Sequence, residues 1–333
     1  MTKKPDADAI LGFMGGLAAT LPEARSWWPK WIFRSDHVEN AAKILNSGAL
    51  LSRAAAEQDR LILQDAASQT HITELTSELR RYVRLYFRPR TPTNFANEGI
   101  RPRSQYEYGG AHMPVPVFLL FSVDLLGERG IRFTRGRLTA GTEIGESLEF
   151  LQGTNFADIY HDSGVGVRGS PDRKSHILNA RNAEVLAVDT LGLDHLRHIV
   201  CRSEPERDTL LSLLEPAAAE WWIRRITLPG RRQLFNTRGT YVEKVDLGPG
   251  HSQFTFYPGN NSDWRGPFAL RIDWFEEHGP GMYYENETFT VQQSPLRLSL
   301  TRTLDRYTVE VRLDGHLAYR GRFVRATKPD IFF

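Results

Sequence analysis

The order of apolar and polar positions divides the chain into a first part with helical and strand patterns and a last part with strand patterns alone. Short apolar runs typical of strands occur at residues 31–33, 82–87, 114–123, 132–134 and 185–188. Helical patterns occur at residues 36–48, 71–81 and 203–222. In the first of these helices, Asp36 and Glu39 fit a capping box and Gly48 is the expected stop. This irregular mixture favours an α+β fold over a regular βαβ repeat.

After Arg225 the pattern is typical of an all-β domain. Residues 240–245, 253–257 and 307–313 alternate between polar and apolar side chains. The pair Asp314-Gly315 lies between two strand patterns and predicts a hairpin. We therefore expect a β-sandwich or barrel of about 100 residues. The predicted divisions are an N-terminal extension (1–30), an α+β domain (31–227) and a β-rich accessory domain (228–333).

Charge is informative locally rather than globally. The chain has 333 residues, 41% of them hydrophobic and 25% charged, which is typical of a globular protein, and its net charge of +2 does not by itself indicate a nucleic-acid binder. Residues 80–104, however, contain one acid, Glu98, and seven arginines: Arg80, Arg81, Arg84, Arg88, Arg90, Arg101 and Arg103. Arginine forks interleaved with aromatic rings suit phosphates and unstacked bases. The alternative is a solvated strand edge with core aromatics.

Other patterns argue against several classes of site. A single cysteine, Cys201, excludes a disulfide framework and indicates a reducing compartment. No segment approaches the length that spans a bilayer, so we expect a cytoplasmic protein without a membrane partner. The Gly-x-Gly-x-x-Gly pattern at 164–169 lacks the strand before it and the helix after it that a dinucleotide-binding turn requires. His195 and His198 have no further ligands beside them, so no metal site is expected.

Two motifs about a hundred residues apart are the strongest functional signal. One runs Tyr-Val-Arg-Leu-Tyr-Phe-Arg-Pro-Arg-Thr-Pro from Tyr82 to Pro92, and the other runs Asn-Ala-Arg-Asn-Ala-Glu-Val-Leu-Ala-Val from Asn179 to Val188. The second brings a lone carboxylate, Glu184, to the start of an apolar strand. With the His-x-x-Asn element at 37–40 and the Ile-Leu-x-x-Gly-x-Leu stretch at 44–50, these motifs resemble the DarT family over roughly residues 31–227. DarT proteins are bacterial toxins that transfer ADP-ribose from NAD to DNA bases.

The resemblance implies both a fold and an activity. The fold is an ADP-ribosyltransferase-like split antiparallel β core with helices, here followed by the all-β domain. The activity is that of a toxin or phage-defence effector that consumes NAD and modifies a base, thymidine or guanosine, in single-stranded DNA. A cognate antitoxin that removes ADP-ribose or binds the enzyme is implied as a partner.

The resemblance also assigns roles to individual residues. Glu184 is the expected catalytic residue. The expected NAD-binding residues are Arg34, His37, Asn40, Tyr82, Arg88 and Arg90. Tyr160, Arg168 and Arg173, in the glycine-rich segment before Glu184, are expected to stack on or grip the DNA strand. Arg34 stands where the family often has a histidine.

Elementary chemistry supports a single carboxylate in this role. Breaking the bond between nicotinamide and ribose builds positive charge on the ribose, as glycoside hydrolysis does. One carboxylate in a dry, preorganised site can stabilise that cation, and nicotinamide leaves without needing a proton. A base nitrogen must be presented unstacked, which favours a single-stranded substrate.

Alternative interpretations remain open at this stage. The same chemistry could act on RNA, or the chain could be a non-catalytic module that binds single-stranded nucleic acid. Glu184 could also be a sheet-edge carboxylate paired with Arg181 or Arg173. The β-rich accessory domain could recognise a phage protein and trigger the enzyme.

Overall fold

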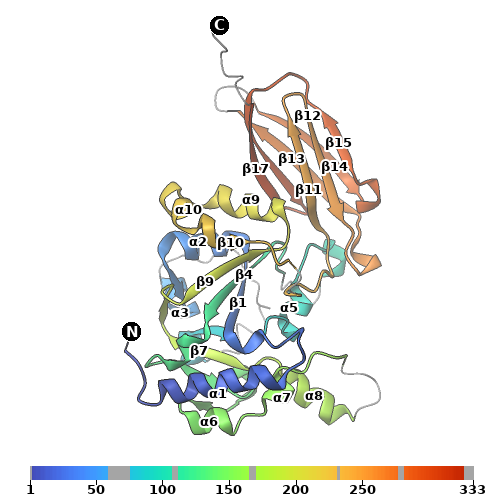
Figure 1. Ribbon diagram of the computed structural model, residues 1–333. Coiled ribbons are helices and arrows are strands. Elements are labelled where there is room, and N and C mark those ends of the chain that lie inside the picture. The colour runs from blue at the N-terminus through green and yellow to red at the C-terminus, as the bar shows by residue number, and fades with distance from the viewer. Residues whose placement is uncertain are drawn as a thin grey trace.

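An eight-stranded sheet organises the first part of the chain (Figure 1). In the computed structural model, which describes residues 2–58, 76–106, 112–164, 170–230, 233–276 and 281–325, neighbouring strands of this sheet are antiparallel except for β9 and β10. The strand order across the sheet is β10 (Ile226–Thr227), β9 (Leu196–Cys201), β4 (Pro116–Ser122), β1 (Trp31–His37), β3 (Tyr82–Tyr86), β7 (Glu184–Val188), β5 (Arg132–Thr134) and β6 (Ile144–Gly145). A separate pair is formed by β2 (Ala49–Leu51) and β8 (Thr190–Gly192).

The sheet opens between β1 and β3. Strand β1 pairs with β4 at every residue from Trp31 to His37, whereas it pairs with β3 only at Phe33 and Tyr86. Strand β3 in turn pairs along its whole length with β7. The two halves of the sheet therefore diverge beyond Phe33, as expected for a split antiparallel core, and the predicted α+β class is confirmed.

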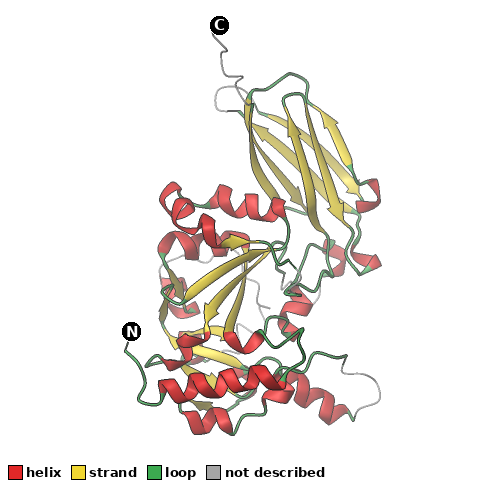
Figure 2. Cartoon of the chain, in the orientation of Figure 1, coloured by secondary structure: helices red, strands yellow, loops and turns green. Residues whose placement is uncertain are grey.

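Helices cover the sheet on both sides (Figures 1 and 2). One group consists of α1 (Ala7–Thr20), α6 (Leu148–Gln152), α7 (Phe156–Ile159) and α8 (Pro171–Ala180). The other group consists of α2 (Val38–Ser47), α9 (Glu204–Leu213) and α10 (Pro216–Trp222). The short helices α3 (Arg53–Gln58) and α5 (Pro92–Asn97) follow β2 and β3, respectively. Short 3-10 helices lie at Trp28–Lys30, Leu79–Arg81, Arg103–Gln105, Val123–Gly127, Leu138–Ala140, Ile223–Arg225, Ser262–Trp264 and Val291–Gln293. None of the helices in these described ranges is both long and apolar enough to cross a membrane.

Two helix boundaries differ from the sequence expectation, and the helix predicted at 71–81 lies partly outside the described residues, which hold a 3-10 helix at Leu79–Arg81. The cap of α2 is His37 rather than Asp36, because the Asp36 carboxylate is bound by the Arg34 guanidinium. The end at Gly48 (φ 75°) is as predicted, with its N–H donating to the Ile44 carbonyl. The single helix expected at 203–222 is two helices, since Pro216 has no N–H to donate and pushes the residue before it into an extended conformation.

The last part of the chain is a sandwich of two antiparallel sheets, as predicted (Figure 2). One sheet contains β11 (Tyr241–Gly248), β12 (His251–Tyr257) and β15 (Leu296–Ser299). The other contains β14 (Met282–Phe289), β13 (Phe268–Phe275), β16 (Arg306–Leu313) and β17 (His316–Val324). Inward side chains of both sheets, such as Phe254 and Ile272, share one core. Asp314 and Gly315 both have positive φ (50° and 84°), as a two-residue hairpin requires.

Each part of the protein contributes residues to the hydrophobic core of the other. Ile100 belongs to the core of the sandwich, and its backbone pairs with that of Thr240 through two hydrogen bonds (3.0 and 2.9 Å). Leu234 and Phe235, which precede the sandwich, are buried in the core of the first part. Beside this crossing, a Cβ added to Gly99 would lie 2.7 Å from the Gly239 Cα, so glycine is needed there.

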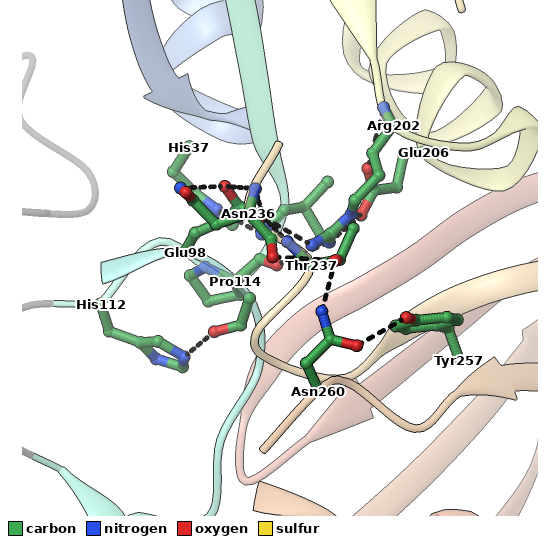
Figure 3. A network of polar contacts seen from close by, with 12 residues as sticks. His37, Glu98, His112, Pro114, Arg202, Glu206, Asn236, Thr237, Tyr257 and Asn260 are labelled. Carbon is green, nitrogen blue, oxygen red and sulfur yellow. Dashed lines mark hydrogen bonds and ion pairs between the residues drawn. The ribbon is translucent and has the colours of Figure 1, made fainter. Parts of the chain in front are cut away.

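A buried carboxylate locks this crossing (Figure 3). Glu98 is 2% exposed, and its carboxylate accepts hydrogen bonds from the backbone N–H groups of Asn236 (2.8 and 2.9 Å) and Thr237 (2.8 Å). The side-chain amide of Asn236 donates a further hydrogen bond to it (3.0 Å). Two successive N–H groups that converge on an anion form a backbone nest. Thr237 adopts φ 55°, a strained conformation for a β-branched residue that its surroundings must enforce. The segment before the sandwich is thus tied to the first part.

Candidate functional site

Glu184 lies at the start of β7, where a turn from the neighbouring strand encloses it. Its side chain is buried, and Oε2 accepts a hydrogen bond from the Leu138 N–H (3.1 Å). Its own N–H donates to the Thr134 hydroxyl oxygen (2.8 Å), and that hydroxyl donates to the Gly136 carbonyl (2.7 Å). Residues 134–138 therefore fix the position and direction of the carboxylate.

The same turn is held against the end of α8. Asn179 accepts a hydrogen bond from the Arg137 N–H (3.0 Å). A Cβ at Gly136 would lie 2.4 Å from the Asn179 amide nitrogen, so any larger residue at this point would displace the Asn179 side chain. The spacing between Asn179 and Glu184 in the second motif is thereby linked to the geometry of the carboxylate.

Strand register places aromatic and basic side chains beside Glu184. Tyr86 lies directly opposite Glu184, and Tyr82 lies opposite Val188 at the other end of the pair. Because opposed residues share a face and alternate residues return to it, Tyr82, Arg84, Tyr86 and Glu184 lie on one face of the sheet. Tyr82, at the far end, accepts a hydrogen bond through its hydroxyl from Arg132 (3.0 Å). Sequence reasoning missed Arg84 and Tyr86 as site residues, although period-two alternation from Tyr82 identifies them.

Arg34 spans the opening between β1 and β3. Its Nη1 donates to the Arg84 carbonyl (2.9 Å) on β3. Its Nε and Nη2 donate to the two oxygens of Asp36 on its own strand (2.6 and 3.0 Å). Burial lowers the pKa of Arg34, but the Asp36 carboxylate outweighs burial and leaves that pKa raised. The guanidinium is therefore a fixed positive charge at the place where the sheet divides.

Electrostatics at the site centre on the buried Glu184. Burial raises the pKa of its carboxyl to about 7, while Arg84, the Leu138 N–H, Arg137 and Arg34 oppose that rise. Burial and the charge of Glu184 together raise the pKa of Tyr86 to about 12, so its hydroxyl stays neutral at ordinary pH. The site thus holds a carboxylate poised near neutrality, with positive charge around it.

His37 and Asn40 stand at the junction of β1 and α2. The His37 ring is fully buried, its Nδ1 accepts from the Val115 N–H (3.4 Å), and its Nε2 faces Glu39 (3.2 Å). Asn40 is half-buried in the first turn of α2. Both residues follow Arg34 closely in the chain, and their NAD contacts remain a prediction.

Arg88 and Arg90 hold a loop in this conformation. The Arg88 side chain is 1% exposed and donates to the carbonyls of Ile159 (3.1 Å) and His161 and to the Asp162 carboxylate (2.6 Å). Burial lowers the pKa of Arg88 to about 9. Arg90 binds the other Asp162 oxygen. Their guanidinium groups are therefore already engaged with residues 159–162, and sequence reasoning missed Asp162 as their shared partner.

The three residues expected to contact DNA have different settings. Tyr160 is buried against Trp28, with ring centroids 6.2 Å apart, so in this conformation it presents no face to a base. Arg173, in the first turn of α8, has a half-exposed side chain that binds Asp158 (2.5 and 2.9 Å). Arg168 lies outside the described residues. Arg181 contacts His161 and Ser163, so neither Arg173 nor Arg181 is paired with Glu184.

The two histidines considered for a metal have other partners. His195 faces Glu128 (3.3 Å), and His198 packs against Trp31 with ring centroids 5.0 Å apart. Within the described ranges, no group of three or more histidine, cysteine, aspartate or glutamate side chains could hold a metal ion. Cys201 is buried in β9, which raises its pKa well above the usual value.

Comparisons with known proteins point to one family. A family model described as single-stranded DNA thymidine ADP-ribosyltransferase, DarT, matches residues 33–225. DarT from Thermus sp. 2.9 in complex with ADP-ribosylated single-stranded DNA is 17% identical over 62% of this chain and 96% of its own, with a TM-score of 0.47. The same protein in complex with NAD+ is 18% identical over 64% of this chain and 98% of its own, with a TM-score of 0.45. DarTG from Thermosipho africanus in complex with ADP-ribose is 15% identical over 66% of this chain and 53% of its own, with a TM-score of 0.44. No curated protein matches the chain.

Proposed function

The chain belongs to the DarT family of single-stranded DNA thymidine ADP-ribosyltransferases, and from this premise we propose that it transfers ADP-ribose from NAD to thymidine in single-stranded DNA. The observation that carries the proposal is the setting of Glu184, a buried carboxylate inside the matched region that is held by a turn and surrounded by positive charge. Guanosine is the alternative base, and RNA the alternative acceptor.

In the proposed reaction, Glu184 stabilises the ribosyl cation. The bond between the ribose C1′ and the nicotinamide nitrogen breaks, and nicotinamide leaves with the bonding electrons. The carboxylate accepts a hydrogen bond from the 2′-hydroxyl and balances the charge that develops on the ribose. A ring nitrogen of the base then bonds to C1′ and gives up its proton. A carboxylate with a pKa near 7 is suited to accept that proton.

Arg34 is the proposed partner of the NAD pyrophosphate. Its side chain lies at the opening of the sheet and is 28% exposed, and a phosphate oxygen would accept from the N–H groups that Asp36 and the Arg84 carbonyl leave over. His37 and Asn40, on the segment that follows, would orient the adenosine half. Arg88 and Arg90 support this site through the loop at 159–162, and Arg173 is the proposed phosphate contact of the DNA strand.

NAD binding separates an enzyme from a DNA-binding module. We expect NAD to raise the melting temperature of the protein, and Arg34→Ala to abolish that shift because the pyrophosphate loses its charged partner. Arg129→Ala, which removes an exposed arginine bound to the Lys3 carbonyl, is the matched control and should keep the shift. An unchanged shift in Arg34→Ala would contradict this role.

Nicotinamide release identifies the acceptor. Release from NAD should be fastest with single-stranded DNA and slow with RNA or no acceptor, and Glu184→Gln should stop it. Faster release with RNA would favour the alternative acceptor, and an absence of release would overturn the proposed enzyme. Expression in a bacterial host should be toxic, and a cognate antitoxin should relieve the toxicity.

A further inference from the structure

An exposed phenylalanine lies on the helix between β3 and β4, the strands that the chain places in different halves of the eight-stranded sheet. Phe95 in α5 is 52% exposed. Two residues earlier, Thr93 contacts the Asn182 side chain (3.2 Å), close before Glu184 in the chain. The adjacent Asn94 accepts a hydrogen bond from Ser35 (2.8 Å) on β1. Helix α5 (Figure 1) therefore contacts residues on both sides of the opening of the sheet, and Phe95 is exposed to solvent.

An arginine from the other part of the protein holds this ring. The Arg238 guanidinium lies 4.2 Å from the Phe95 ring centroid and 4.4 Å from that of Trp264, which is buried. It also donates a hydrogen bond to the Phe95 carbonyl (2.8 Å). One face of the phenylalanine ring is thus covered by a cation, which restrains the ring while about half of the residue stays exposed to solvent.

The charges around Phe95 favour an anionic ligand. Arg238 contacts α5 at Phe95 and Arg90 precedes the helix in the chain. Arg88 and Arg90 share the single carboxylate of Asp162, which leaves an excess of positive charge there. The Glu98 carboxylate is enclosed by Asn236 and Thr237. Asp263, beside Trp264 in the chain, is an exposed acid. An aromatic face next to arginines is the usual platform for a single strand, since a base stacks on the ring while its phosphate meets a guanidinium.

We propose that Phe95 and Arg238 form a base-stacking platform for the single-stranded DNA, so that the β-rich accessory domain takes part in substrate binding. Phe95 contacts a base that flanks the modified one, and Arg238 positions the ring. The proposal rests on the proposed function for the identity of the strand, and it extends the DNA-binding surface beyond residues 33–225, the region of the family match.

Fluorescence anisotropy with a labelled thymidine-rich oligonucleotide, without NAD, tests the platform. Phe95→Ala should weaken binding about tenfold, the usual loss for one stacked base, and Phe95→Trp should restore it. Arg238→Ala should weaken binding about threefold or more. Tyr283→Ala is the matched control, because Tyr283 is an even more exposed aromatic residue (65%) with the Arg271 guanidinium 5.0 Å from its ring centroid. It should bind as the wild type does.

The outcomes separate this inference from the proposed function. Wild-type affinity in Phe95→Ala, or an equal loss in Tyr283→Ala, would overturn the platform even if ADP-ribose transfer is observed. Tighter binding of RNA of the same sequence, or no binding of DNA by the wild type, would also overturn it. Binding that depends on Phe95 without any transfer of ADP-ribose would instead retain the platform and contradict the proposed enzyme.

Discussion

The buried Glu184 carboxylate lowers the stability of the folded protein. An ionised carboxylate that is buried with a single backbone N–H donor loses more hydration than it recovers, and in the described part of the chain no ion pair reaches it. Arg34, Arg84 and Arg137 act on it only from a distance. Such a destabilising arrangement is typical of functional sites.

The cost of Glu184 makes stability depend on pH. Its pKa is raised from 4.5 to about 7, so between these values the folded protein keeps a proton that the unfolded chain has lost. Stability therefore falls as pH rises through this window, and the full cost of about 3 kcal/mol is present above pH 7. Relative to the wild type, Glu184→Gln should gain about 3 kcal/mol between pH 4 and pH 8 in urea unfolding. A difference independent of pH would show that the carboxyl is not perturbed.

Activity should have the opposite pH dependence. The ionised form of Glu184 is the one that stabilises a ribosyl cation, so kcat/KM for transfer should rise about tenfold per pH unit below 7 and level off above it. Tyr86 adds no step in this range, because its pKa is about 12. The check is a series of initial rates from pH 5 to pH 9, and a flat profile would contradict a carboxylate role.

At the scale of elements, α5 and the segment that follows it connect the eight-stranded sheet to the sandwich. Glu98 caps the C-terminus of α5, and its carboxylate is enclosed by the nest of Asn236 and Thr237 (Figure 3). Arg202 approaches the same carboxylate (3.7 Å) and binds Glu206 in α9. These contacts of Glu98 fix the position of the C-terminal end of α5, the helix that carries Phe95.

Removal of the Glu98 carboxylate should destabilise the whole protein. Glu98→Ala leaves the N–H groups of Asn236 and Thr237 without their acceptor and leaves Arg202 with Glu206 as its remaining carboxylate, at a cost of about 3 kcal/mol. Asp305→Ala removes a carboxylate from the exposed pair with Arg325 and should change the unfolding free energy by less than about 1 kcal/mol. Equal effects of the two substitutions in urea unfolding would show that the lock contributes little.

For the whole molecule, the boundary expected at residue 228 does not separate the two cores. Ile100 is buried in the sandwich, and Leu234, Phe235 and Leu317 are buried in the first part. A chain that ends at residue 227 should therefore expose Ile100 and lose these three residues from its core. We expect it to aggregate or melt without cooperativity in circular dichroism. A soluble fragment with the wild-type melting temperature would show that the accessory domain is dispensable for folding.

The sequence was informative where the signal is local. Glu184 at a strand start, the strand at 82–86 and the Asp314-Gly315 hairpin all follow from neighbouring residues. Tyr160 is buried against Trp28, and Arg88 forms an ion pair with Asp162. Both contacts join residues far apart in the chain, so the local pattern of apolar and polar positions does not predict them. The division of the helix expected at 203–222 into α9 and α10 could have been predicted, because Pro216 is a local signal for a helix break.

Mass spectrometry of a single-stranded DNA oligonucleotide after incubation with the protein and NAD tests the central claim most directly. The expected result is a gain of one ADP-ribose on thymidine, absent with Glu184→Gln. The matched control Glu143→Gln changes an exposed glutamate paired with Arg135 and should leave the product intact. Fragmentation that places the adduct on guanosine would change the base but keep the chemistry. An unmodified oligonucleotide with the wild type, or an equal yield with Glu184→Gln, would contradict the assignment of Glu184 as the catalytic residue.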